Sequence, residues 1–328
     1  MTNTPITAGS KSYILWKKET EFNTAVVPDT HFGLDTNFSR NFSNDLKLRK
    51  GMAGSTTSGR DTQKILGGKT ETTNSVEFDL NDPNFLEFVL GDKTTSTYSG
   101  TDIPPSITIA NCLDNVTTDR DELFSGVVCN RCTIKGAEGE PITVSLDLMA
   151  ADFNKDTALT ANVAIVDQKP FTFANGTFEL PNATAITNVV NSFEFTINNN
   201  WTMHYGPNNK PQYATPGERV YTMKLETKYV DDDLLDKALG STGGISADGP
   251  TINASMELVL TRPNNDTLTL LTGGIAIGAH NLTAQLNNPV GESIDLSPLQ
   301  LGYSIVRREH RSKSKNSNNC RINCLNLI

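Results

Sequence analysis

Two closely spaced pairs of cysteines are the residues in this chain whose types and spacing best suit a chemical site. Cys129 and Cys132 have CxxC spacing and Cys320 and Cys324 have CxxxC spacing, so together they could offer four thiolates to a zinc ion. The first pair falls in an expected β-strand, where side chains alternate between faces, and the second falls in a polar tail. We therefore expect no metal site. The fifth cysteine, Cys112, makes the total odd, which argues against a disulfide framework.

Three other patterns approach known sites but lack residues that those sites require. The stretch GSTTSGRD ends in Arg60 and Asp61, where a phosphate-binding loop needs Lys and then Ser or Thr. The stretch that begins DFNKD carries Thr157 and Val163, where a calcium loop needs Gly and Glu. The histidines show neither HExxH spacing nor a neighbouring GxSxG motif. We therefore expect that the chain is not an enzyme and takes no cofactor.

The stretch that positions the first cysteine pair predicts a β-hairpin. It reads VCNRCTIKGAEGEPITVSLDLMAA at residues 128–151, with one strand at 128–134, a turn at 135–140 and a returning strand at 142–148. Apolar and polar residues alternate along the returning strand, which is typical of a strand with one buried face. The residues expected on its buried face are Ile142, Val144, Leu146 and Leu148.

Residues 37–69 are polar and basic, and glycines interrupt them repeatedly. We expect a long loop here without regular structure. A loop of this length is uncommon in a compact domain unless it contacts a partner or stays mobile. Its basic residues include Lys47, Arg49, Lys50, Arg60, Lys64 and Lys69.

A strand followed by a short helix is predicted twice. Residues 75–80 form the first strand, and its helix is capped by Asp82 and stopped by Gly91. Residues 221–230 form the second strand, and its helix is stopped by Gly240. Either an internal duplication or a chance match over a dozen residues explains the recurrence.

Alignment of the two helices on their final glycines places Leu90 on Leu239, and Leu80 is matched with Val230 with an offset of one residue in the strand. The remaining segments are rich in β-forming residues and separated by Gly, Pro or Asn turns, so the fold class is mostly β. We expect a β-sandwich or barrel with short packed helices and two tandem domains, at residues 1–165 and 166–306. Residues 307–328 are expected to form a basic flexible arm.

The charge of the chain is uneven. The formal net charge is −9, the final segment from Arg307 onward carries +5, and residues 1–306 therefore carry −14. An acidic body is a poor static binder of nucleic acid, although it suits a surface that DNA slides past; solubility alone is the other interpretation. The sequence shows neither an export signal nor an apolar run of about 20 residues, so we expect synthesis in a cytoplasm and no membrane contact.

Three elements occur in a recognisable order along the chain. They are the capped helix that ends in Leu-Gly, the hairpin at 128–151, and the strand FEFTINNNW at 193–201, which a proline-rich loop follows. Over about residues 12–306 the chain resembles the tail tube (major tail) proteins of long-tailed bacteriophages and archaeal tailed viruses. The resemblance implies a structural virion protein whose sheets line a lumen. Subunits would close into rings, and stacked rings would form the hollow tube through which viral DNA passes.

The same resemblance implies homo-oligomers and contacts with tail terminator, tape measure and baseplate proteins. We expect the basic loop to cross between rings, through Lys47, Arg49, Lys50, Arg60 and Lys64. A second set is expected to line the lumen or the ring interface: Lys135, Glu138, Glu140 and Asp147. If the duplication is real, three chains form a pseudo-hexameric ring; a hexamer of chains is the alternative.

A β-sandwich module that binds carbohydrate or mediates adhesion is the alternative function. Trp201 with Tyr205 and Tyr213 could form a platform on which a sugar stacks. A Trp buried at a sheet corner is the other interpretation of the same residues.

Overall fold

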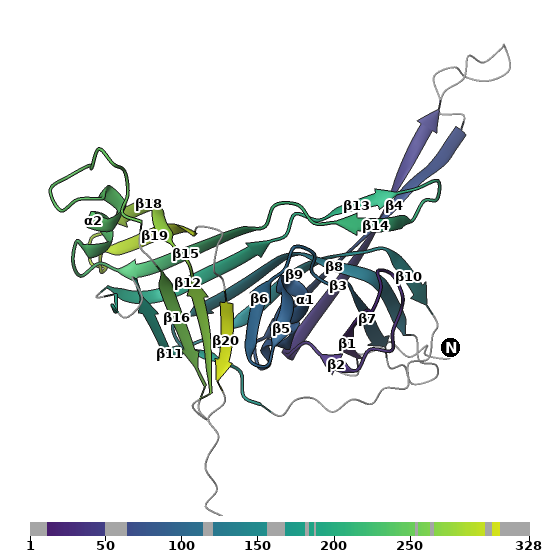
Figure 1. Cartoon of the computed structure of the whole chain (residues 1–328), viewed down its shortest axis with the longest axis horizontal. Helices are drawn as coiled ribbons and strands as arrows, with labels where there is room; N and C mark the ends of the chain where they lie inside the picture. Colours follow the sequence, from purple (N-terminus) through teal and green to yellow (C-terminus); the bar gives the residue numbers. More distant parts are fainter. Residues whose placement is uncertain are drawn as a thin grey trace, which may run out of the picture.

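The computed structural model describes the chain at residues 12–49, 64–113, 121–155, 168–180, 184–186, 188–252, 255–262, 266–298 and 304–308. Antiparallel strands dominate these residues, in three sheets (Figure 1). Within the same ranges, the helices are all too short or too polar to cross a membrane.

The largest sheet has 12 strands. In chain order they are β1 (Ser12–Lys18), β2 (Thr30–His31), β3 (Leu34–Arg49), β4 (Lys64–Asp79), β7 (Ile107–Leu113), β8 (Glu122–Ala137), β9 (Thr143–Ala150), β10 (Asp152–Lys155), β12 (Val189–Asn198), β15 (Val220–Lys228), β18 (Ile275–Thr283) and β19 (Gly291–Pro298). Eight of them pair side by side in the order β3–β4–β9–β8–β12–β15–β19–β18. We call this series the eight-strand row.

The second sheet has six strands and faces the row across the core. They are β5 (Gly91–Thr94), β6 (Thr97–Gly100), β11 (Thr172–Glu179), β16 (Met256–Thr261), β17 (Thr267–Thr272) and β20 (Ser304–Arg308). The third sheet is the hairpin of β13 (Thr202–Tyr205) and β14 (Pro211–Thr215). Because Arg307 and Arg308 belong to β20, the expected C-terminal arm does not begin at residue 307; residues 309–328 lie outside the described residues.

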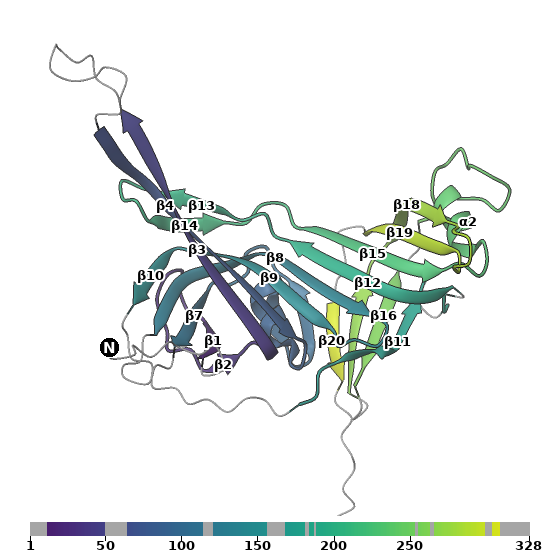
Figure 2. The same ribbon diagram turned by 180° about the vertical axis from the view of Figure 1, so that it is seen from behind.

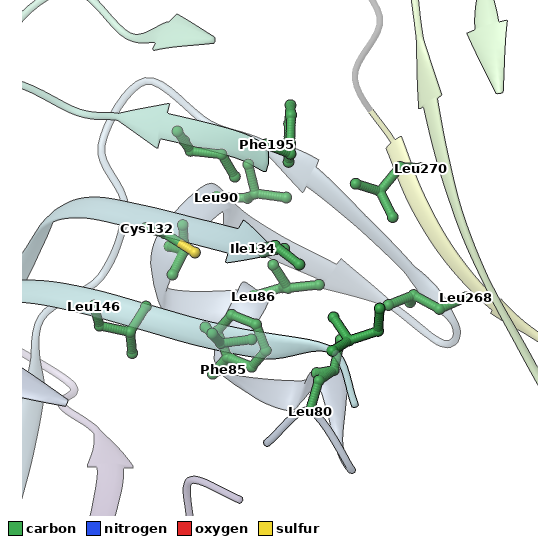
Figure 3. Close-up of a cluster of buried hydrophobic side chains, with 14 of the residues drawn as sticks. Leu80, Phe85, Leu86, Leu90, Cys132, Ile134, Leu146, Phe195, Leu268 and Leu270 are labelled. Atoms are coloured by element: carbon green, nitrogen blue, oxygen red, sulfur yellow. The ribbon is translucent and has the colours of Figure 1, made fainter. Parts of the chain in front are cut away.

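Alternation of apolar and polar residues fixes which face of each strand is buried. Ile142 and the three apolar residues predicted with it on the returning strand of the hairpin are all buried, which confirms that prediction. The core spans both halves of the chain, and Figure 3 shows Leu86 and Leu90 close to Cys132, Ile134 and Phe195. Strands from both halves pair in both large sheets, and the predicted domain boundary at residue 165 stays a prediction.

Both predicted helices are present. The first begins with the 3₁₀ turn η2 (Pro83–Phe85), whose cap Asp82 accepts a hydrogen bond from the amide of Asn84, and continues as α1 (Leu86–Leu90). It ends at Gly91, whose φ of 121° strongly disfavours other residues. The second is α2 (Asp233–Leu239), which ends at Gly240 in the left-handed conformation.

The prediction of an irregular loop at residues 37–69 is wrong at residues 37–49 and 64–69, and residues 50–63 lie outside the described residues. The described part of that segment belongs to β3 and β4, whose pairing continues to Arg49 and Lys64. These strands project from the body as a two-stranded arm, and β13–β14 lies beside it (Figures 1 and 2). Strands that expose both faces to water lack an alternating apolar pattern, so the sequence carried no strong signal for them.

Candidate functional site

The face of the eight-strand row that points away from the core is polar and exposed. Charges of opposite sign are paired across its strands: Lys135 lies 3.2 Å from Glu194, and Arg131 lies 3.6 Å from Asp147. Side chains on this face include Glu77, Asp79, Arg131, Thr133, Lys135, Ser145, Asp147, Glu194, Thr196, Lys224, Glu226 and Asp295. Such a face combines acidic residues with cations that are already neutralised by neighbours.

A shallow groove of about 490 Å³ crosses this face at the turn between β8 and β9. Lys135 and Glu140 line it, and Glu138 of the same turn lies 3.7 Å from the ammonium of Lys228. Partial burial raises the pKa of Asp79 in this groove, and the nearby carboxylates, Glu140 among them, raise it further. The four residues predicted for the hairpin therefore lie on or beside one polar surface, and their role in lining a lumen stays a prediction.

The cysteine pair of the hairpin does not alternate between faces as expected. A β-bulge at Asn130 shifts the register between β8 and β9, so Cys129 and Cys132 both point into the core. Burial raises the pKa of both thiols well above the ordinary value, which disfavours the thiolate that binds zinc. Among the described residues, no group of three or more His, Cys, Asp or Glu side chains could hold a metal ion. Cys320 and Cys324 lie outside the described residues.

The eight-strand row consists of two consecutive units with the same strand order. The first unit is β3–β4–β9–β8, and the second unit is β12–β15–β19–β18. In each unit a hairpin leads into a helix, and the last two strands form a second hairpin packed on that helix. The units join where β8 pairs with β12, which we call the internal junction.

Irregularities of the pairing recur at matching positions in the two units. The register between β8 and β9 skips Asn130, and the register between β18 and β19 skips Gly278. The register between β12 and β15 skips Asn191; at the matching place in the first unit, β3 carries an extra residue opposite β4. Matching bulges make a chance resemblance of the two units a poor explanation, because each is a local departure from regular pairing.

The matched registers correct the sequence alignment by one residue in the strand. Leu80 and Tyr229 each donate a backbone hydrogen bond to the neighbouring strand, to the carbonyls of Ile142 and Val290. Leu80 is therefore the counterpart of Tyr229 and not of Val230. The expected match of the helices holds, because the stop glycines and the capping carboxylates coincide.

A buried hydrogen-bond cluster holds the internal junction together. The side-chain amide of Asn199 donates to the carbonyls of Val89 and Cys129, both at 3.0 Å, and its oxygen accepts from Arg219 at 2.7 Å. The guanidinium of Arg219 also donates to the carbonyl of Leu90, at the end of α1. The second unit is thereby fixed to the last turn of the first unit's helix.

The two ends of the eight-strand row are strand edges with partly exposed apolar residues. Among the described strands, β3 pairs only with β4, and β18 pairs only with β19. Leu282 on β18 is 53% exposed, whereas its counterpart at the internal junction, Ile134, is 0% exposed. On β3, Phe38 is only partly buried, whereas its counterpart Phe193 is buried. Each edge therefore exposes apolar surface, and a neighbouring strand covers the counterpart of that surface at the internal junction.

The arm places its predicted basic residues beside apolar ones that sequence reasoning missed. Lys47 is exposed on β3, Arg49 ends that strand and Lys64 begins β4, while Lys50 and Arg60 lie outside the described residues. Four large apolar side chains along the arm are half or more exposed: Leu46, Leu48, Ile65 and Leu66. Apolar side chains on a projecting arm could have been recognised only once the arm was known to be a hairpin, since they alternate with charges.

Burial of Trp201 argues against the proposed sugar platform, although Trp201 and Tyr213 line one hollow of about 230 Å³. Trp201 is buried, and its backbone amide donates to the side chain of Asn130. Tyr213 stacks on His204 at 4.7 Å between ring centroids, on the separate hairpin of β13 and β14. This arrangement agrees with the interpretation of Trp201 as a buried corner residue.

Comparison with known proteins identifies one family. No curated protein matches the chain. The model of a family described as "Phage tail tube protein" matches residues 9–298, which is most of the sequence. The sheets, the polar face and the paired units described above therefore belong to a structural protein of the phage tail, and this chain is a member of the phage tail tube protein family.

Proposed function

We propose that copies of this chain close into rings by pairing β18 of one subunit with β3 of the next. The internal junction carries the argument, because it already joins the last strand of one unit to the first strand of the following unit. Repeating that contact between subunits covers both edges of the eight-strand row and their partly exposed apolar residues. A contact between unlike surfaces of the same chain forms a closed ring when the rotation per subunit divides a full turn.

We propose three subunits per ring, which supply six units of four strands and give pseudo-sixfold symmetry. The repeat of strand order and bulges supports this count over a hexamer of chains, because each chain contributes two units. The tube would be a homo-oligomer that tail terminator, tape measure and baseplate proteins contact at its ends. Its subunits would be made in the host cytoplasm and assembled into the virion tail.

The polar face of the eight-strand row is our candidate for the lumen wall past which viral DNA moves. Its lysines and arginines are paired with carboxylates, for example Lys135 with Glu194, so few cations remain to hold phosphates. The lumen-facing set would include Lys135, Glu138, Glu140 and Asp147. A wall of this kind opposes tight binding and permits sliding.

The arm is our candidate for the contact between stacked rings. Its exposed leucines offer apolar area, and Lys47 with its basic neighbours offers attraction to the acidic body of the next ring. The predicted contact therefore has two components, one apolar and one electrostatic.

Electron microscopy of the purified protein over a range of concentrations tests the proposal. We expect hollow rods with regular striations, and their helical symmetry will give three subunits per ring. Six subunits per ring would contradict the trimer, and compact single particles at every concentration would contradict the tube.

A further inference from the structure

An exposed leucine stands on the turn between β18 and β19. Leu286 is 91% exposed, the highest value among the large apolar side chains of the described residues. The two strands that this turn joins form the β18 end of the eight-strand row (Figures 1 and 2). A single exposed leucine is common on protein surfaces, so the significance of Leu286 lies in its position relative to the β3 edge and not in its exposure alone.

A hollow of about 490 Å³ lies beside the opposite edge of the row. It is walled by the start of β1, the start of β3 and the end of β7. Its lining includes the apolar side chains Tyr13, Ile14, Phe38 and Leu113, with Thr36 at the β3 edge.

The internal junction relates these two features. There, the amide of Glu138, on the turn between β8 and β9, donates to the carbonyl of Asn191 at 2.9 Å. Both hairpin turns span the same number of residues, from Lys135 to Thr143 and from Thr283 to Gly291. The matched registers make Leu286 the counterpart of Glu138 and Thr36 the counterpart of Asn191.

We propose that Leu286 of each subunit packs against the neighbouring copy of this chain beside Thr36, at the rim of the hollow, with its amide donating to the Thr36 carbonyl. This inference rests on the proposed ring and specifies its contact. Glu138 at the internal junction is an exposed, charged residue paired with Lys228, so the apolar contact is peculiar to the junction between subunits. The difference lets the chain distinguish its two junctions although their backbones match.

Disulfide trapping tests the contact. The double variant Leu286→Cys/Thr36→Cys, in a background with Cys320→Ser and Cys324→Ser, should form covalent dimers and larger species on non-reducing gels. The matched control is Glu138→Cys/Asn191→Cys, which carries the same pair at the internal junction and should form a disulfide within one chain. Residues of each pair must lie within about 7 Å between Cα atoms for the bond to form.

Substitution without cysteines gives a second measurement. Leu286→Asp should raise the protein concentration needed for ring formation about tenfold or more, because a buried leucine contributes about 1.5–3 kcal/mol. The conservative variant Leu286→Met should form rings at about the same protein concentration as the parent protein. The control Val27→Asp should have no effect, because Val27 lies away from the hollow. The amide of the preceding residue, Val26, donates to Thr108, which pairs with Lys17 at the opposite end of β1.

The outcomes separate this proposal from the tube itself. If rings form but the Leu286–Thr36 pair gives no disulfide between subunits while the internal control is oxidised, the Leu286 contact is refuted and the ring stands. If Leu286→Asp assembles as well as the parent protein, the contact is likewise refuted. If the parent protein forms no rings at any concentration, both proposals fail.

Discussion

Replacing Asn199 by Ala should destabilise the isolated subunit severely. Asn199 is 1% exposed, and its side chain makes three hydrogen bonds at the internal junction, two of them to the first unit. Two of them satisfy backbone carbonyls, and the third holds the guanidinium of Arg219. The substitution removes all three and leaves buried polar groups without those partners.

The expected magnitude follows from these bonds. Hydrogen bonds between neutral groups contribute about 0.5–1.5 kcal/mol each, and a bond to a charged group contributes about 1.5–3 kcal/mol. The two amide-to-carbonyl bonds and the bond to Arg219 together give a loss of roughly 2.5–6 kcal/mol in the free energy of unfolding. That loss is a large share of the total stability of an ordinary domain.

The chain supplies a matched control for this measurement. Asn44 is the counterpart of Asn199 on β3; it is exposed and accepts a hydrogen bond from Thr70 at 2.8 Å. Asn44→Ala should change the free energy of unfolding by less than about 0.5 kcal/mol, as is usual for exposed substitutions. Urea denaturation of dilute, unassembled subunits, followed by the fluorescence of the two buried tryptophans, Trp16 and Trp201, measures both variants. A loss below about 1 kcal/mol for Asn199→Ala would refute our view that this residue anchors the internal junction.

Two further predictions concern the arm and the buried cysteines. Replacing Leu46 and Leu48 with Ser should leave rings intact but shorten the rods seen by electron microscopy, because both side chains are more than half exposed on the arm. Lys47→Ser is the control that isolates the electrostatic component, and rods of unchanged length in the leucine variant would exclude an apolar contact there. Burial raises the pKa of the Cys129 and Cys132 thiols, so the folded chain keeps protons that the unfolded chain loses above about pH 9. The free energy of unfolding should therefore fall as the pH rises through that range, and alanine at both positions should make the fall shallower in urea titrations.

The sequence predicted the elements that have one buried face and one exposed face. The returning strand of the hairpin alternates regularly, and the capped helix ends at a glycine that its φ of 121° requires. Those patterns are local, and they determined the mostly β fold class correctly.

The sequence could not show where the pairing of the strands departs from a regular register. No residue type marks Asn130 as a bulge, yet that bulge turns both cysteines of the CxxC pair into the core. The arm was hidden for another reason, because both of its faces meet water and its glycines resemble those of a loop. The hollow beside Thr36 required the three-dimensional packing of β1, β3 and β7, which lie far apart in the sequence.

The internal junction also has a kinetic consequence. Because β8 and β12 belong to one chain, their contact forms during folding and needs no encounter between molecules. In any closed ring built from these chains, every second junction is then intramolecular, with an effective concentration that tethering sets independently of dilution. In such a ring, half of the circumferential contacts would form without a collision, and assembly would need fewer than half as many association steps as a ring built from separate units.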